Sequence, residues 1–129
     1  MSKRILIFDQ DRDFANTIAA RLKSLGVETV VATGRVEATT RASWDDFDMF
    51  CVDVDVESGR GLTFCEFVTW NEDTRNQPVV VLTARSHPDE IRRCCDFAPQ
   101  FVRKSRNCWN DLRSLILQRW PQLELAAVS

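Results

Sequence analysis

The stretch that decides the fold is Met49-Phe50-Cys51-Val52-Asp53, four apolar residues followed by a carboxylate. A short continuous apolar run is typical of a strand buried on both faces of a parallel sheet. Three other strand-like runs also end at a polar residue: Arg4–Phe8 at Asp9, Val79–Leu82 at Thr83, and Phe101–Arg103 at Lys104. In an open parallel sheet the carboxyl ends of the strands share one edge, where ligands bind. Two carboxylates, a hydroxyl and an ammonium at that edge can hold a divalent cation and a phosphoryl group.

Segments with helical spacing alternate with these strands. A further β-branched strand is expected at Val27–Val31, and helices are expected near residues 13–25, 34–43, 61–68, 88–95 and 109–120. Asp11 or Asp13 can cap the first helix, and Gly26 can end it. Five strands alternating with five helices predict an α/β fold, a doubly wound parallel sheet with right-handed crossovers. The natural strand order is the flavodoxin-like 2-1-3-4-5.

Size and composition indicate a single domain with no nucleic-acid or membrane function. The chain has 129 residues, of which 44% are hydrophobic, and a formal net charge of -2. This charge gives no support to a nucleic-acid module, which is usually strongly basic. No apolar run approaches the roughly 18 residues of a membrane span, and no signal peptide precedes the first strand. We expect a soluble cytoplasmic protein with a domain at 1–122, a tail at 123–129 and no effector domain.

Other site chemistries find little support in the sequence. The five cysteines are odd in number and irregularly spaced, which argues against a disulfide framework. His87 is the only histidine and no CxxC pair accompanies it, so neither a zinc site nor Cys–His catalysis is indicated. A flavodoxin-type cofactor site would need a loop rich in Gly, Ser or Thr after the first strand. The loop here, Asp9-Gln10-Asp11, would repel an anionic phosphate.

The chain resembles the receiver domain of bacterial two-component response regulators over about residues 3 to 119. The matching pieces, in order, are KRILIFDQDRDF (3–14), FCVDVDVESGRGLTFC (50–65), PVVVLTAR (78–85) and FVRKS (101–105). The spacing from Asp53 to Gly61 is the family's spacing from its phosphoacceptor to its third helix. Each piece alone is weak, whereas four in order at the correct distances form a strong pattern.

The resemblance implies a role for each matching residue. Asp53 would be the phosphoacceptor, Asp9 a ligand of Mg²⁺, Asp55 a further ligand through its backbone carbonyl, Thr83 a hydrogen-bond partner of the phosphoryl oxygens, Lys104 their ion-pair partner, and Phe101 the aromatic switch residue. Elementary chemistry supports such a set. A carboxylate attacks a phosphate dianion only when charge is neutralised, which a hard cation and a fixed ammonium achieve.

Two departures from the family pattern bear on the chemistry. The family has two adjacent acids after the first strand, whereas this chain has Asp9-Gln10. Gln10 offers a neutral amide oxygen in the metal site, so we expect at least a tenfold loss of Mg²⁺ affinity. Two nearby acids, Asp11 and Asp55, are candidates to compensate for the missing charge, and the side chain of Asp55 is the better one. The family lysine is usually followed by proline, often in a cis bond, but Ser105 follows Lys104 here, leaving cis and trans both open.

Two functional hypotheses follow. In the first, the chain is a non-enzymatic receiver domain, phosphorylated on Asp53 by a histidine kinase or phosphotransfer protein. In the second, it is a pseudo-receiver that binds protein partners without phosphorylation. A downstream protein, or a second copy in a homodimer, would bind the last two helices and the strand between them, which carry Arg92, Arg93, Arg103, Arg106 and Arg113. Asp55 and Arg85 are expected to pair across the pocket mouth and shield an aspartyl phosphate from water.

Overall fold

The protein is described by a computed structural model over residues 2–54, 60–84 and 100–124. The elements are β1 (Arg4–Phe8), α1 (Arg12–Ser24), β2 (Glu28–Ala32), α2 (Arg35–Trp44), β3 (Met49–Asp53), α3 (Arg60–Trp70), β4 (Val79–Thr83), β5 (Gln100–Arg103) and α5 (Cys108–Arg119). The five strands form one sheet with the order β2-β1-β3-β4-β5 and parallel pairing throughout. The predicted fold class and strand order are therefore confirmed. The helix expected near 88–95 lies outside the described residues.

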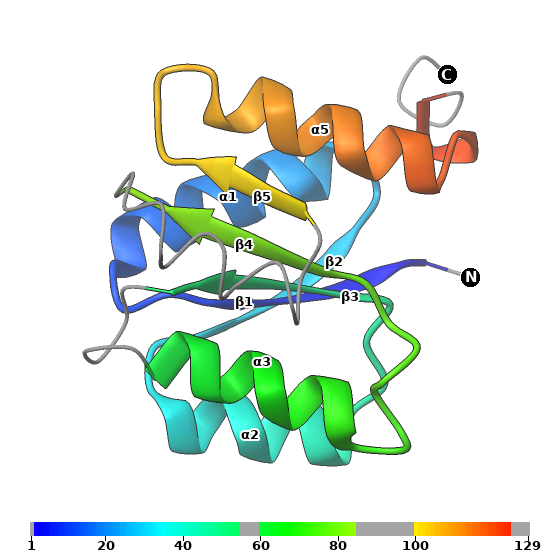
Figure 1. Cartoon of the computed structure of the whole chain (residues 1–129). Helices are drawn as coiled ribbons and strands as arrows, with labels where there is room; N and C mark the ends of the chain where they lie inside the picture. The colour runs from blue at the N-terminus through cyan, green and yellow to red at the C-terminus, as the bar shows by residue number, and fades with distance from the viewer. Residues whose placement is uncertain (1, 55–59, 85–99, 125–129) are drawn as a thin grey trace.

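The sheet is the middle of three layers. Figure 1 shows α1 and α5 on one face and α2 and α3 on the other. Alternate residues of a strand point to opposite faces, so β1 contributes Ile5 and Ile7 to one core and Leu6 and Phe8 to the other. All four of these side chains are fully buried. Burial on both faces explains why the strands read as continuous apolar runs.

The first helix starts and ends as its sequence indicates. The Asp11 carboxylate caps α1 by accepting a hydrogen bond from the Phe14 backbone N–H at 3.0 Å. Gly26 follows the helix with φ of 80°, a left-handed conformation that glycine adopts without steric cost. The N-cap and the C-terminal glycine together fix where the chain leaves β1 and where it enters β2.

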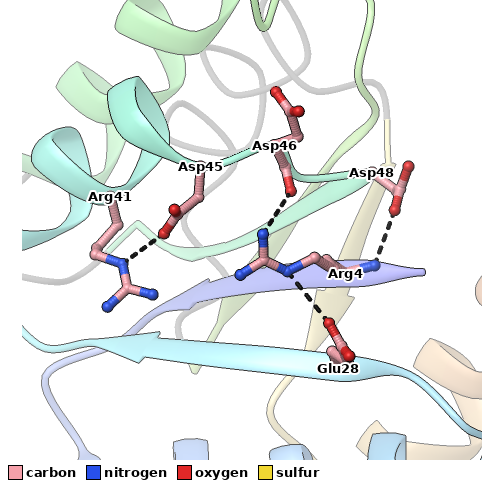
Figure 2. Close-up of polar contacts among 6 residues, drawn as sticks. All are labelled: Arg4, Glu28, Arg41, Asp45, Asp46 and Asp48. Atoms are coloured by element: carbon pink, nitrogen blue, oxygen red, sulfur yellow. Dashed lines mark hydrogen bonds and ion pairs between the residues drawn. The ribbon is translucent and has the colours of Figure 1, made fainter. Parts of the chain in front are cut away.

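Helix α2, which was expected near residues 34–43, has a narrow buried face. Ala38 and Ala42 are buried, whereas Val36 is 73% exposed. The helix ends at Asp45, whose carboxylate accepts a hydrogen bond from Arg41 Nε at 2.9 Å (Figure 2). Two small alanines allow α2 to lie close to the sheet.

The C-terminal end of the described chain is folded beyond α5. Leu123, which was expected in the tail, is 9% exposed and packs with Leu112 and Ile116 in the core beneath α1 and α5. Residues 122–124 are helical, and the domain boundary expected at residue 122 stays a prediction. In the described part of the chain, no helix combines the length and apolarity needed to cross a membrane.

Arg4 connects three segments at the end of the sheet where the parallel strands begin. Its backbone N–H donates to Asp48 Oδ2 at 2.8 Å, and its Nε lies 3.4 Å from Glu28 Oε2 (Figure 2). A terminal guanidinium nitrogen donates to the Asp46 carbonyl at 3.3 Å, and the guanidinium lies over the Phe47 ring at 5.2 Å. These contacts join β1 to β2 and to the loop before β3.

The buried thiol of Cys51 makes the stability of the fold depend on pH in the alkaline range. Burial raises the pKa of Cys51 from 9.0 to about 12, with a smaller effect of Cys108. The folded state therefore favours the protonated thiol. Its stabilising contribution is complete below pH 9.0 and is lost as pH rises towards 12.

We expect the free energy of unfolding to decline less steeply with pH in Cys51→Ala than in the wild type above pH 9.0. The difference in slope should not exceed about 1.4 kcal/mol per pH unit for one group. Denaturant titrations followed by tryptophan fluorescence measure it, and the chain has no tyrosine to titrate in this range. Slopes are compared because the smaller side chain also lowers stability at neutral pH. Identical slopes would contradict the prediction.

Candidate functional site

The candidate site lies at the carboxyl edge of the sheet, towards which the strand arrows point in Figure 1. Asp53 and Thr83 are the last residues of β3 and β4, and Asp9 and Lys104 directly follow β1 and β5. The hydrogen-bond ladder continues past the strand ends. Asp9 N–H donates to the Ala32 carbonyl at 3.0 Å, and Lys104 N–H donates to the Thr83 carbonyl at 2.8 Å. Both residues therefore have a fixed backbone position.

The Lys104 ammonium bridges the two carboxylates. Its Nζ lies 2.7 Å from Asp9 Oδ2 and 3.0 Å from Asp53 Oδ2. The side chains of Asp9, Asp53 and Lys104 are 0%, 7% and 15% exposed, so the cluster is largely removed from water. Removing either partner of such a buried ion pair is expected to lower the stability of the fold strongly, because it leaves an uncompensated charge in the interior.

Asp9 is the most constrained acid of the cluster. Burial raises its pKa above the usual 3.8, and the Asp53 charge raises it further, against the hydrogen bonds from Lys104 and from the Asp11 backbone N–H. The Asp11 N–H donates to Asp9 Oδ1 at 2.9 Å, while Oδ2 faces Lys104. One carboxylate oxygen of Asp9 therefore accepts a backbone N–H, and the other faces the ammonium.

Lys104 remains an ammonium in this pocket. Burial lowers its pKa, but the hydrogen bonds and charges of Asp9 and Asp53 outweigh that effect and raise the pKa above 10.5. The group is thus a fixed positive charge at neutral pH. Such a charge can neutralise a phosphoryl group that arrives at Asp53.

Three other residues predicted for the site lie at different depths. Thr83 is buried at the end of β4, one position beyond Leu82, which is the register partner of Asp53 in the neighbouring strand. Phe101 is 42% exposed on β5 and borders a cavity of about 490 Å³ between β5 and α5. Gln10 is exposed in the loop after β1. The edge thus combines a buried charged centre with an exposed aromatic residue.

The turn after Lys104 contains Ser105 where the family pattern has a proline. The Lys104–Ser105 peptide bond is trans. Ser105 N–H donates to the Arg103 carbonyl at 2.8 Å, and Ser105 Oγ accepts from Asn107 N–H at 3.2 Å. The Ser105 hydroxyl and backbone therefore stabilise the turn that leads into α5, and Lys104 still reaches both carboxylates.

The donor set is the kind that Mg²⁺ prefers. Asp9 and Asp53 present carboxylate oxygens beside each other, and oxygen is the ligand of hard cations. No group of three or more His, Cys, Asp or Glu side chains is placed to hold a metal within residues 2–54, 60–84 and 100–124. Asp55 and Arg85 lie outside the described residues, so the pairing expected for them stays a prediction.

Phe14 and Gly61 were not predicted as site residues, yet both contact the site. The Phe14 ring centroid lies 4.4 Å from Lys104 Nζ. Gly61 packs so closely against the end of β3 that a Cβ there would lie 2.8 Å from Val54 Cα. In the sequence Phe14 reads as a residue of the apolar face of a helix, and Gly61 as the start of one.

Comparisons with known proteins agree with this geometry. The response regulator receiver domain model matches residues 5–108. A CheY-like receiver domain from Methanospirillum hungatei superposes with a TM-score of 0.84 at 19% identity, covering 98% of this chain and 99% of that one. The response regulator TrrA of Thermotoga maritima, solved with Mg²⁺ and BeF, gives 0.78 at 22% identity, covering 90% and 97%. A crystal structure of the histidine kinase ThkA in complex with TrrA gives 0.77 at 22% identity, with the same coverage.

The fold and the acidic edge define a signalling module of the two-component type. Because the family model spans most of the sequence, the chain belongs to the response regulator receiver domain family. The solved structures, all below 25% identity, support the fold alone. Among curated proteins, none matches the chain significantly.

Proposed function

We propose that Asp53 accepts a phosphoryl group from a histidine kinase or phosphotransfer protein, and that the modified site alters a protein-binding surface. The observation that carries this proposal is the Asp53 carboxylate held 3.0 Å from the Lys104 ammonium, with Asp9 on the other side of that ammonium. A carboxylate nucleophile needs such charge neutralisation to approach a phosphoryl group.

The chemical step requires little beyond positioning. Asp53 forms a new P–O bond while the P–N bond of the donor phosphohistidine breaks, and the imidazole leaves with the electron pair. Lys104 shifts its ion pair from the Asp53 carboxylate to the phosphoryl oxygens, and the Thr83 hydroxyl donates a hydrogen bond to one of them. Asp9 keeps the other side of the ammonium in place.

A metal ion fits this site as a resident cofactor. Asp9, Asp53 and the backbone carbonyl of Asp55 would hold it, with Gln10 supplying a neutral amide oxygen where the family has a second acid. Bound Mg²⁺ would supply positive charge that offsets the repulsion between the carboxylate and the phosphate. Lys104 already neutralises part of the acidic charge, so a bound ion would compete with the ammonium for the Asp9 and Asp53 carboxylates.

Intact mass measurement after incubation with Mg²⁺ and acetyl phosphate tests the proposal. We expect a mass increase of one phosphoryl group in the wild type and none in Asp53→Asn. Asp48→Asn, which changes an acid on the opposite edge of the sheet, is the matched control and should be modified normally. An unmodified wild type under conditions that modify a known receiver would reject the proposal.

A phosphorylation-independent receiver is the second candidate function. Gln10 favours it, because one of the two acids that usually bind the metal is a neutral amide here. In that case the same protein would bind its partner with equal affinity in the wild type and in Asp53→Asn. A partner isolated with the chain decides between the two candidates when its affinity is measured before and after treatment with acetyl phosphate and Mg²⁺. An affinity that changes in the wild type but not in Asp53→Asn supports the phosphorylation switch, and an affinity that stays equal in both supports the phosphorylation-independent receiver.

Gln10→Asp is expected to tighten Mg²⁺ binding by at least tenfold. The substitution restores a negative charge near the dication, and most of the gross attraction is offset by desolvation. Quenching of tryptophan fluorescence or calorimetry during a metal titration measures the affinity without any phosphodonor. Gln118→Asp on the exposed side of α5 adds the same charge away from the site and should leave the affinity unchanged. Equal affinities in wild type and Gln10→Asp would show that the missing acid is not the limiting feature.

The kinase and output surfaces belong to this proposal as well. The ThkA–TrrA complex is a histidine kinase bound to a structurally similar receiver, which supports a kinase as the upstream partner. For the output we propose the face formed by β5 and α5. Phe101 is partly exposed there, and Arg103 and Arg106 are exposed beside it.

A further inference from the structure

The ammonium of Lys104 has a third neighbour besides its two carboxylates. The half-buried ring of Phe14, in the first turn of α1, has its centroid 4.4 Å from Lys104 Nζ. Asp9 and Asp53 lie 2.7 and 3.0 Å from the same nitrogen. The ammonium is therefore enclosed by two negative charges and one aromatic ring, which leaves 15% of the lysine side chain exposed.

One short turn places the ring and the Asp9 carboxylate together. Asp11 donates its backbone N–H to Asp9 Oδ1 at 2.9 Å, and its own carboxylate accepts the Phe14 N–H at 3.0 Å. Asp11, the N-cap of α1, is thus hydrogen-bonded both to the Asp9 carboxylate and to the backbone of Phe14. These bonds hold the backbone that carries the ring close to the acid.

An aromatic face attracts a cation through its quadrupole without adding a charge. A third carboxylate at this place would raise the cost of burying the cluster, whereas an aliphatic side chain would fill the space without attracting the ammonium. The family's proline, which would restrict the backbone after the lysine, is replaced by Ser105 in a trans peptide. A contact to the lysine side chain itself can supply that restriction.

We propose that Phe14 is a positioning residue, whose ring face holds the Lys104 ammonium against Asp9 and Asp53. The positioning of Lys104 by Phe14 is inferred only from the contacts of the ammonium with the ring and the two carboxylates. The kinetic consequence rests on the proposed function, because a displaced ammonium slows phosphorylation only if Asp53 is a phosphoacceptor.

A double-mutant cycle tests the positioning. Phe14→Leu keeps an apolar side chain against the core but removes the ring, and Lys104→Met removes the charge. We expect the two substitutions to be coupled by about fivefold in the unfolding equilibrium constant, measured by denaturant titration. Phe67→Leu, a half-buried phenylalanine on the other face of the sheet, is the matched control and should show no coupling with Lys104→Met.

NMR provides a measurement that would give no signal if Phe14 only filled space in the core. The Lys104 methylene protons next to Nζ should be shifted upfield by the ring in the wild type and in Phe14→Tyr, and should lose that shift in Phe14→Leu. Absence of the shift in the wild type, or absence of coupling in the cycle, would overturn the inference. This measurement needs no Lys104 variant, so it holds even if Lys104→Met does not fold.

Phosphorylation kinetics separate the two proposals. With acetyl phosphate and Mg²⁺, Phe14→Leu should be modified about threefold more slowly than the wild type, and Phe14→Tyr should restore the rate. If coupling and the ring shift are present but the wild type is never phosphorylated, the proposed function fails while Phe14 retains its role. If the wild type is phosphorylated and Phe14→Leu matches it in rate, coupling and spectrum, the role of Phe14 fails alone.

Discussion

Lys104→Met should lower the free energy of unfolding by about 3 kcal/mol at neutral pH, because it leaves two buried carboxylates without their counter-ion. The side chains of Asp9 and Asp53 are 0% and 7% exposed, so water cannot replace the ammonium. Urea titrations followed by tryptophan fluorescence measure the change. Lys23→Met, at an exposed position of α1, is the matched control and should stay within about 0.5 kcal/mol of the wild type.

The effect of Lys104→Met should shrink in acid. The folded-state pKa of Asp9 is raised by burial, so protonated Asp9 contributes stability that is complete below pH 3.8 and is lost as pH rises through the folded pKa. Removal of the ammonium raises that pKa further. The variant therefore accepts a proton on Asp9 where the wild type does not, and the two proteins converge in stability as pH falls. A difference that is independent of pH would contradict this account.

Gly61→Ala is expected to destabilise the protein by about 3 kcal/mol, the upper part of the range for overpacking. The added Cβ would lie 2.8 Å from Val54 Cα and 3.0 Å from the Asp53 carbonyl carbon, with the Asp53 carbonyl oxygen closer still. These are backbone atoms at the end of a central strand, so they cannot rotate away. Helix α3 must instead move off the sheet or displace the peptide of Asp53.

Gly26→Ala provides the comparison for this prediction. A Cβ at Gly26 meets nothing within 4 Å, but φ of 80° strains any other residue, at a cost of about 1–2 kcal/mol. Chemical denaturation ranks the two variants, and intact mass after acetyl phosphate treatment shows whether Asp53 has moved. We expect slower modification in Gly61→Ala alone. Equal stability losses and equal modification rates would mean that the close contact with β3 has no special importance.

The sheet could be predicted because its signals are local. The apolar runs ending at Phe8, Val52 and Leu82 are each long enough for one buried strand, and their alternation with helical spacing leaves few topologies. Helix α2 was also predicted, although its signal in the sequence is weaker, since only Ala38 and Ala42 are buried in it and Val36 is exposed. A pattern with two small buried residues carries little periodicity.

The residues that lie at the candidate site could be predicted, but the contacts between them could not. Parallel strands bring their carboxyl ends to one edge, so the positions of Asp9, Asp53, Thr83 and Lys104 follow from the order of the strands. The roles carried over from the family, including that of Phe101, stay predictions. The positions of Asp55 and Arg85 fall outside the described residues and stay predictions too.

By itself, the sequence determined the doubly wound sheet and which polar residues gather at its edge, because hydrophobic periodicity and strand ends are properties of neighbouring residues. Only the tertiary structure decided that Lys104 bridges both acids, that Ser105 follows it in a trans bond, and that Phe14 covers the ammonium. These contacts join residues up to ninety-five positions apart, since Asp9 meets Lys104. Their distances depend on how α1, β3 and β5 pack together, and that packing is a property of the whole core.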